Sequence, residues 1–282
     1  MPRGLIVLAF AAAASLRGQI PDLNYDASAP LGIEEKVVKD YGFGKLIDLS
    51  FTSPRGGGRV PAYAVIPSRK GALPGIVWQH WGQGDRSSFL PEAFNLARRG
   101  AASIMINAPW LRPDNKPTEG AEADRDSWLN EVVELRRSAD VLVQHFNVDP
   151  KRLAYVGHSY GATMGGLVAV SERRFKALVL MGGFSRYSKA VLKRDSSEKG
   201  KQWAGVVSVI DSDRYIGKAA PAALFLQFAR YDRFVDEQQA NRYAAAASEP
   251  KLVRWYEGGH EFNDAASTRD REEWLAKQLG LR

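Results

Sequence analysis

The sequence predicts an α/β domain with a doubly wound, mostly parallel sheet and helices on both of its faces. Short apolar runs alternate with longer stretches of helical periodicity along most of the chain. The later runs are almost continuously apolar, which is typical of strands buried on both faces of a parallel sheet. Hydrophobic residues make up 45% of the 282 residues, which is enough to fill one large core, and no internal repeat interrupts the alternation.

The first residues of the chain read as a secretory signal peptide. A positively charged start, "MPR", is followed by the apolar run "GLIVLAFAAAAS". The apolar part, Leu5 to Ala14, is much shorter than the roughly 20 residues that a membrane span needs, and its alanines offer small-residue cleavage sites. We therefore expect residues 1–18 to be removed on export to the periplasm or the cell exterior, with no stable membrane insertion afterwards. Residues 19–282 then form a single domain.

Eight apolar or β-branched runs are predicted to be strands. The glycines of "SPRGGGR" can adopt positive φ, so the first two strands can pair antiparallel across that turn. In chain order the runs are "KLIDLSF", "VPAYAVIP", "GIVWQHW", "AASIMINAP", "RLAYVGH", "ALVLMGG", "AALFLQFA" and "LVRWYEG".

Five longer stretches between and after these strands have the pattern of helices. The longest carries an apolar stripe that includes Trp128, Val132 and Leu135, with charges on its other side. The stretches are "RSSFLPEAFNLARRG", "AEADRDSWLNEVVELRRSADVLVQHF", "YGATMGGLVAVSE", "VDEQQANRYAAAAS" and "TRDREEWLAKQLG".

Residues 184–221 separate the sixth and seventh predicted strands, where a fold of this kind often carries an insertion. This length is enough for two short helices but not for an independent domain. We predict a small lid there, which would leave the pocket beneath it fairly open.

The motif "GHSYG", Gly157 to Gly161, lies where a predicted strand passes into a predicted helix. A glycine two residues before the serine and another two residues after it leave room for a sharp turn. Such a turn lifts the Ser159 hydroxyl above the carboxyl edge of the sheet, where open α/β sheets bind ligands. We predict that Ser159 is a nucleophile.

A serine nucleophile needs a base and a carboxylate that orients it, and both follow in the expected chain order. Asp232 comes just after an apolar strand in "FLQFARYD", and His260 lies in the loop "GGHEF" after the last strand. Asp236 is the alternative acid, but it looks like the cap or first-turn charge of a helix. His260 is the only histidine downstream of the acid.

The oxyanion of such a reaction needs two N–H donors. Tyr160, directly after the nucleophile, supplies one backbone N–H in this prediction. The second is expected from the glycine-bearing loop "HWGQG" after the third strand, where Trp81 and Gly82 are favoured and Gln83 stays possible.

Composition argues against several other function classes. The chain has no cysteine, so it can form neither disulfides nor thiolate metal sites, and no histidines are paired at metal-ligand spacing. The net charge of +7 is spread along the chain without a basic block interleaved with aromatics, so we expect no nucleic-acid partner. No sequence feature predicts an oligomeric state.

With "HWGQG", "GHSYG", "ARYD" and "GGH" in order across residues 46–280, the chain resembles the α/β-hydrolase superfamily. Within it, the dienelactone-hydrolase-like and acetyl-esterase-like enzymes are the most similar group. The resemblance implies an eight-stranded fold, acyl-transfer chemistry and no cofactor. Dienelactone hydrolases use a cysteine nucleophile, which this chain lacks, so a serine esterase is favoured. Relatives often carry His-Gly where this chain has "HWG".

We therefore predict a serine esterase that cleaves small or medium acyl esters through Ser159, Asp232 and His260, with a small-molecule ester as substrate and no cofactor. The aromatic residues expected to line its pocket are Trp81, Trp110, Tyr160, Phe184 and Trp203. A secreted serine peptidase of the same fold is one alternative, although it would normally need a further gating domain. A catalytically silent binding protein is the other, and it would be expected to have lost a triad position.

Overall fold

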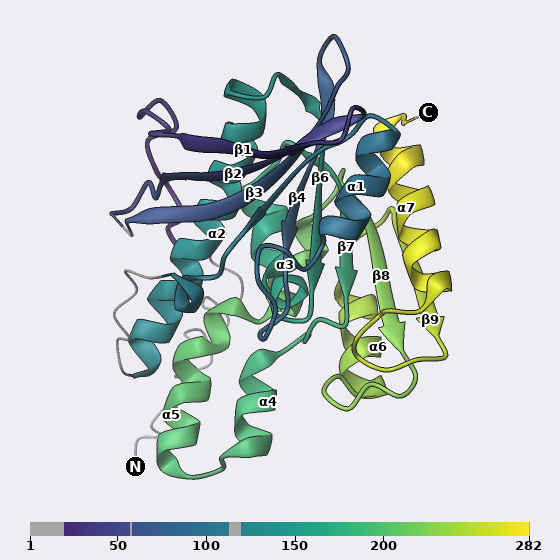
Figure 1. Ribbon diagram of the computed structural model, residues 1–282. Coiled ribbons are helices and arrows are strands. Elements are labelled where there is room, and N and C mark those ends of the chain that lie inside the picture. Colours follow the sequence, from purple (N-terminus) through teal and green to yellow (C-terminus); the bar gives the residue numbers. More distant parts are fainter. Residues whose placement is uncertain (1–19, 57, 113–119, 282) are drawn as a thin grey trace, which may run out of the picture.

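A nine-stranded sheet forms the centre of the computed structural model, which describes residues 20–56, 58–112 and 120–281 (Figure 1). The predicted signal peptide lies outside the described residues. The strands are β1 (Glu34–Asp40), β2 (Gly44–Thr52), β3 (Arg59–Pro67), β4 (Leu73–Gln79), β5 (Ala102–Ile106), β6 (Val148–His158), β7 (Phe175–Met181), β8 (Ala223–Ala229) and β9 (Lys251–Tyr256).

The strands lie in the order β1-β2-β3-β5-β4-β6-β7-β8-β9. The six strands from β4 to β9 run parallel, and β1, β2 and β3 extend the sheet with antiparallel pairs. All eight predicted strands are present. The β2–β3 pair closes through the predicted glycine turn, in which Gly56 and Gly58 have φ of 79° and 76°.

The additional strand, β1, lies at the edge of the sheet, where all of its residues are exposed. Its sequence, "EEKVVKD", has neither an apolar run nor strict alternation, because neither face is covered. Charged side chains on such a strand discourage pairing with other chains.

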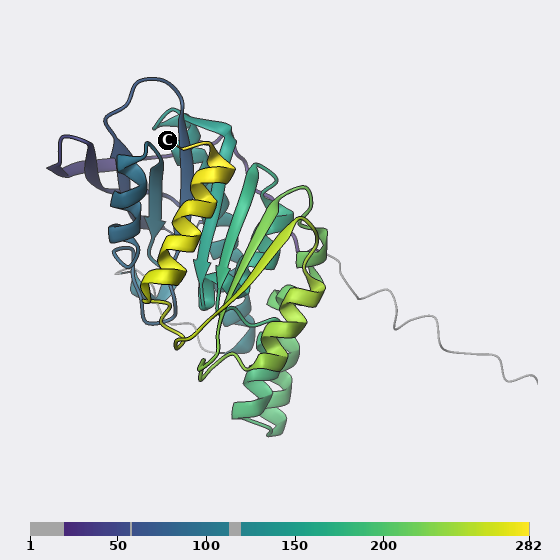
Figure 2. The same ribbon diagram turned by 90° about the vertical axis from the view of Figure 1, so that its right-hand side faces the viewer.

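Helices cover both faces of the sheet, as predicted. One hydrophobic cluster joins the sheet to α1 and α7, and another joins its opposite face to α2, α3 and α6. Figure 2 shows α7 and α6 on opposite sides of the strands. No helix among the described residues is long and apolar enough to cross a membrane. The five helices that cover the sheet are α1 (Leu90–Arg98), α2 (Ala121–Gln144), α3 (Tyr160–Ser171), α6 (Glu237–Ala246) and α7 (Ala265–Leu279).

The predicted insertion between β7 and β8 forms two short helices, α4 (Tyr187–Arg194) and α5 (Glu198–Val207), followed by short 3₁₀ turns. In Figure 1 the two helices lie beyond the carboxyl ends of the parallel strands. Val191, Ala204 and Val207 bury their side chains between them, and Trp128 of α2 packs against this cluster. The insertion therefore rests on the domain at the edge where ligands are expected to bind.

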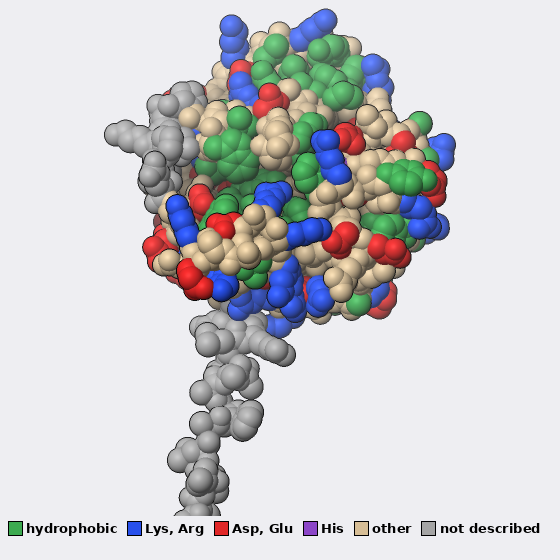
Figure 3. Space-filling view, turned by 90° about the horizontal axis from the view of Figure 1, so that it is seen from below, with side chains coloured by type: hydrophobic (Ala, Val, Ile, Leu, Met, Phe, Trp, Pro, Cys, Tyr) green, Lys and Arg blue, Asp and Glu red, His purple; other side chains and the backbone are tan. Residues whose placement is uncertain are grey.

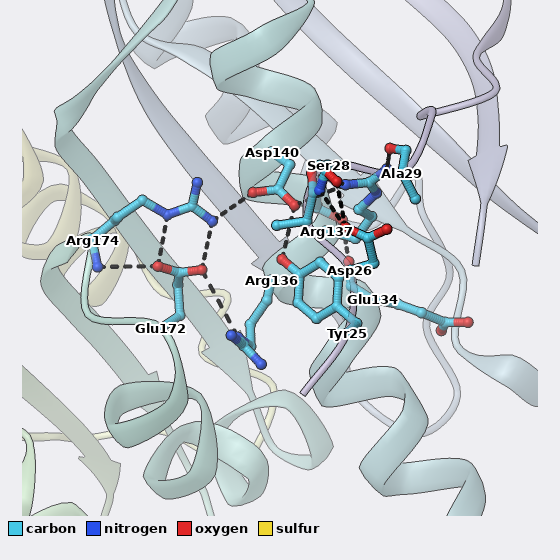
Figure 4. A network of polar contacts seen from close by, with 12 residues as sticks. Tyr25, Asp26, Ser28, Ala29, Glu134, Arg136, Arg137, Asp140, Glu172 and Arg174 are labelled. Carbon is cyan, nitrogen blue, oxygen red and sulfur yellow. Dashed lines mark hydrogen bonds and ion pairs between the residues drawn. The ribbon is translucent and has the colours of Figure 1, made fainter. Parts of the chain in front are cut away.

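The segment before β1 is held against α2 by a buried polar network (Figure 4). The Tyr25 hydroxyl donates to Asp140, 2.8 Å away, and Arg137 donates to the carbonyls of Ala27 and Ala29. Asp140 also accepts from Arg174, and its side chain is 2% exposed. Because each buried charge in this group has a partner of opposite sign, the network can remain in the interior.

Candidate active site

Ser159 lies at the sharp turn from β6 to α3, with φ of 52° and ψ of −101°. A Cβ on Gly157 would lie 2.5 Å from the carbonyl carbon of Gly161, and a Cβ on Gly161 would lie 2.5 Å from the carbonyl oxygen of Gln79. Both glycines are therefore required by the close approach of backbone to backbone. The turn that the motif predicted is present, and the serine has the strained conformation typical of a nucleophile turn.

The side chains of Ser159, His260 and Asp232 form a continuous hydrogen-bonded chain. His260 Nε2 lies 2.7 Å from Ser159 Oγ, and His260 Nδ1 lies 2.7 Å from Asp232 Oδ2. The other carboxylate oxygen of Asp232 accepts the backbone N–H groups of Phe234 and Val235, at 2.8 and 2.9 Å. With its Nδ1 hydrogen donated to Asp232, the imidazole has a free Nε2 lone pair that can accept the serine proton.

The alternative acid and an uninvolved histidine lie elsewhere. Asp236 caps α6 by accepting the Gln239 N–H at 2.9 Å, which is the role its position predicted. His145 follows α2 at the surface and pairs with Glu35. Among the described residues, no group of three or more His, Asp or Glu side chains could hold a metal ion.

A cavity of about 360 Å³ opens beside Ser159. Figure 3 looks onto this side of the molecule, where hydrophobic side chains gather around a hollow. Of the predicted pocket and oxyanion residues, Trp81 and Trp203 do not line the cavity, and those that do are Gly82, Gln83, Trp110, Tyr160 and Phe184. The full lining is Gly82, Gln83, Trp110, Asp124, Trp128, Ser159, Tyr160, Thr163, Phe184, Tyr187, Arg194, Ile210, Phe234 and His260.

Trp81 turns its indole away from this cavity. The ring packs against Phe89 and His158, with centroids 6.2 and 5.2 Å apart. Its carbonyl oxygen is held by His80 Nδ1 at 2.6 Å and by the Gly84 N–H at 3.0 Å. Because a trans peptide points its N–H opposite its carbonyl, the Gly82 N–H points away from the buried His80 ring.

His80 is neutral in this position. Burial lowers its pKa, and its Nε2 accepts the backbone N–H of Ala108 at 3.2 Å while Nδ1 faces the Trp81 carbonyl. The ring therefore fixes one peptide of the "HWGQG" loop against the sheet. The Tyr160 N–H is the second donor candidate, because the first N–H groups of a helix have no intrahelical acceptor.

Several cavity residues were not predicted as pocket residues. Trp128 belongs to the apolar stripe of α2, yet its ring also packs against Tyr160 and Tyr187 in the cavity wall. The ring centroids lie 6.2 and 5.0 Å apart. Trp203 packs in the small cluster between α4 and α5 instead. Asp124, one helical turn before Trp128, was recognisable only as a helix charge, and burial raises its pKa.

Beneath the cavity, the Tyr160 hydroxyl donates to the fully buried Glu131. Burial raises the pKa of Glu131 to about 8. Nearby, Arg112 forms a bidentate pair with the buried Glu134, at 2.8 and 2.5 Å. The hydrogen bond to Glu131 fixes the orientation of the Tyr160 side chain in the cavity wall.

Comparison with known protein families finds a match for the second half of the chain. The sequence profile of the prolyl oligopeptidase family matches residues 123–280, which is more than half of the chain. None of the curated proteins matches significantly.

Solved structures share the fold. An acetyl xylan esterase from Paenibacillus sp. R4 is 17% identical over 90% of this chain and 90% of that chain, with a TM-score of 0.75. Acetyl xylan esterase 1 from Thermoanaerobacterium sp. JW/SL YS485 is 17% identical over 91% and 90%, with a TM-score of 0.73. A puromycin-hydrolyzing peptidase of Mycobacterium tuberculosis is 18% identical over 87% of this chain but 41% of that chain, with a TM-score of 0.63. These likenesses show an α/β-hydrolase fold.

Proposed function

The chain belongs to the prolyl oligopeptidase family of serine hydrolases, and we propose that it cleaves carboxylic esters of small or medium acyl groups. The observation that carries this proposal is the hydrogen-bonded chain from Ser159 through His260 to Asp232 at the wall of an open cavity. A volume of about 360 Å³ is at the lower end of the range for small-molecule sites, so a long acyl chain would have to extend into solvent.

In the proposed mechanism, His260 Nε2 takes the Ser159 proton as Oγ attacks the ester carbonyl. Asp232 keeps the Nδ1 hydrogen in place and stabilises the imidazolium. The Tyr160 and Gly82 N–H groups bind the oxyanion, since Gly82 lines the cavity and the Trp81 peptide is held by His80. The imidazolium then protonates the departing alcohol, and water releases the acid by the same steps in reverse.

Peptide bond cleavage is the second candidate function. The family match favours it, because the prolyl oligopeptidase family is named for peptidases. Against it, the insertion that lies beside the cavity in the described residues consists of two short helices and short 3₁₀ turns. An ester also has a better leaving group than a peptide, so its cleavage depends less on further residues that would position and protonate the leaving group.

The test is hydrolysis of p-nitrophenyl esters from acetate to palmitate, beside a series of peptide anilides. Ser159→Ala should lose nearly all turnover, by a factor on the order of 10⁴ or more. Ser171→Ala is the matched control, because Ser171 lies at the opposite end of the same helix. Rapid cleavage of short esters that Ser159→Ala abolishes supports the esterase, whereas cleavage of anilides alone would move the assignment to a peptidase. Full activity in Ser159→Ala would refute both, and inertness of the wild-type protein toward both series would favour a binding role.

We also propose that residues 1–18 are removed on export. The support is the charged and apolar pattern of the sequence, together with the tethering of residues 23–29 to α2 a few positions later. The intact mass of the protein recovered outside the cytoplasm should lack about 18 residues. A full-length mass in the cytoplasm alone would contradict export.

A further inference from the structure

His158, the residue directly before the nucleophile, makes a contact that the triad does not require. Its side chain is 3% exposed, and its Nε2 lies 2.6 Å from the carbonyl oxygen of His260. Burial lowers the pKa of His158 to about 3, so the ring is neutral near pH 7. A carbonyl only accepts hydrogen bonds, so the neutral ring must carry its hydrogen on Nε2 and donate it.

The His158 ring also fills the space between two loops of the site. It lies 5.2 Å from the Trp81 ring in the "HWGQG" loop and 5.1 Å from the His260 ring, measured between centroids. The Phe262 ring packs against it at a steep angle, with the ring centroids 5.5 Å apart. One side chain thus touches the loop of the oxyanion donor and the loop of the base, while its own backbone adjoins the nucleophile.

The loop that carries His260 is held in an uncommon conformation. In this loop Phe262 has φ of 47°, and Gly182, which packs against the loop from the end of β7, has φ of 55°. A Cβ on Gly182 would lie 2.8 Å from the Phe262 ring and 3.2 Å from the His260 ring. A non-glycine residue at positive φ persists only where its surroundings fix it, and the His158 hydrogen bond is a direct side-chain tie to the backbone of this loop.

We propose that His158 is a positioning residue for the base: it fixes the His260 backbone against the nucleophile turn and so maintains the Nε2–Oγ distance through acylation and deacylation. The inference rests on the proposed function, in which Ser159 is the nucleophile. A neutral ring suits this role, because a second positive charge 5.1 Å away would oppose the imidazolium that His260 forms during the reaction.

Two substitutions separate the hydrogen bond from the packing. His158→Phe keeps a planar ring in contact with Trp81 and Phe262 but removes the donor. His158→Gln places an amide N–H close to the position of Nε2 and so restores the donor. His145→Phe is the matched control, since His145 lies at the surface with 36% of its side chain exposed.

The assay is steady-state hydrolysis of p-nitrophenyl acetate, with the rate of Ser159 labelling by a fluorophosphonate measured in parallel. His158→Phe should lower kcat by about 10- to 100-fold with KM within about twofold, since a 1 Å misplacement of a catalytic group costs about 100-fold. The labelling rate should fall by a similar factor. His158→Gln should recover activity to within about fivefold of wild type, and His145→Phe should leave both rates unchanged.

The outcomes distinguish this inference from the proposed function. If the wild-type protein does not react with the fluorophosphonate at all, the nucleophile assignment fails. If the wild-type protein reacts and a folded His158→Phe reacts equally fast, the positioning role is refuted. If both variants are folded and equally impaired, packing rather than the hydrogen bond explains the loss, and the proposal is again refuted. Should His158→Phe not fold, His158→Gln alone decides, because a loss well beyond fivefold contradicts the role assigned to the donor.

Discussion

Gly157→Ala tests whether the nucleophile turn depends on the absence of a side chain two residues before Ser159. The added Cβ would lie 2.5 Å from the carbonyl carbon of Gly161, 2.6 Å from its oxygen and 2.8 Å from the Ala162 nitrogen. Carbon atoms in contact are normally separated by about 3.5 Å, so the first turn of α3 must retreat by roughly 1 Å. All three contacts are with backbone atoms, so no rotamer change can relieve them.

Two losses should follow from that displacement. The retreat moves the Ser159 hydroxyl relative to His260 and moves the Tyr160 N–H with it, so kcat/KM should fall by about 100-fold. Overpacking of this kind costs about 1–3 kcal/mol of unfolding free energy. With a urea m-value of about 3 kcal/mol/M, the midpoint should fall by roughly 0.3–1 M.

The assay is p-nitrophenyl acetate hydrolysis combined with urea denaturation of the same samples. Gly205→Ala is the control, because Gly205 lies exposed in α5 and a Cβ there would meet nothing within 4 Å. That variant should keep its activity and gain up to about 1 kcal/mol, since alanine is the better helix former. If Gly157→Ala retained wild-type kcat/KM and the wild-type midpoint, the turn would be looser than these distances state and the reasoning would be wrong.

Three further predictions address the acid, the buried carboxyl and the N-terminal network. Asp232→Asn should lower kcat for ester hydrolysis by roughly 10⁴-fold, because the imidazole loses the tautomer that the reaction needs. Asp236→Ala should leave kcat unchanged and lower the unfolding free energy by only about 1 kcal/mol in urea denaturation. Equal effects of the two substitutions on kcat would overturn the choice of acid. The pKa of Glu131 is raised to about 8 in the folded protein. The neutral carboxyl therefore stabilises the folded state in full at pH values below the pKa of the unfolded chain. That stabilisation is lost as the pH rises through the folded pKa. The unfolding free energy should therefore fall by up to about 1.4 kcal/mol per pH unit between about pH 5 and 8. In Glu131→Gln it should fall less steeply with pH. Identical pH dependence in the two proteins would contradict the raised pKa of Glu131. Asp140→Ala leaves the buried Arg137 without its carboxylate, so Tm should fall markedly, by the equivalent of about 3–5 kcal/mol, and an unchanged Tm would refute the network.

The sequence predicted those strands and helices in which burial requires a recognisable pattern of apolar residues. Strands β4, β7 and β8 and the second half of β6, residues 153–158, are covered on both faces, so most of their residues had to be apolar, and the runs were visible. Strand β1 has no such apolar run, because it is exposed and only its backbone pairing with β2 makes it a strand. The chain order of Ser159, Asp232 and His260 could be predicted for a similar reason, since Ser159 directly follows a recognisable strand and the other two lie in the loops just after such strands.

The walls of the cavity were less predictable, because they depend on where side chains in loops and insertions turn. Trp81 and Gly82 are adjacent in the same turn, yet Gly82 lines the cavity while the Trp81 indole packs against Phe89. Trp128 has the spacing of a core residue and occupies that stripe, but the neighbouring insertion leaves part of its ring facing the cavity. The periodicity of apolar residues shows which face of a helix is buried. It does not show which part of that face remains uncovered once a segment distant in the sequence packs against it.

The strained residues of the described chain indicate why the site can hold its geometry. Three non-glycine residues there have positive φ, and two of them, Ser159 and Phe262, lie in the site. Each comes after a strand of the parallel sheet, and each is held by a neighbouring element. The Ser159 N–H donates to the carbonyl oxygen of Met181, and the Phe262 ring packs against His158. Strain of this kind costs about 1–3 kcal/mol per residue and persists only where packing over-determines the backbone. The buried sheet supplies that packing, so the serine and the base can be held at 2.7 Å by loops that would not keep these conformations alone.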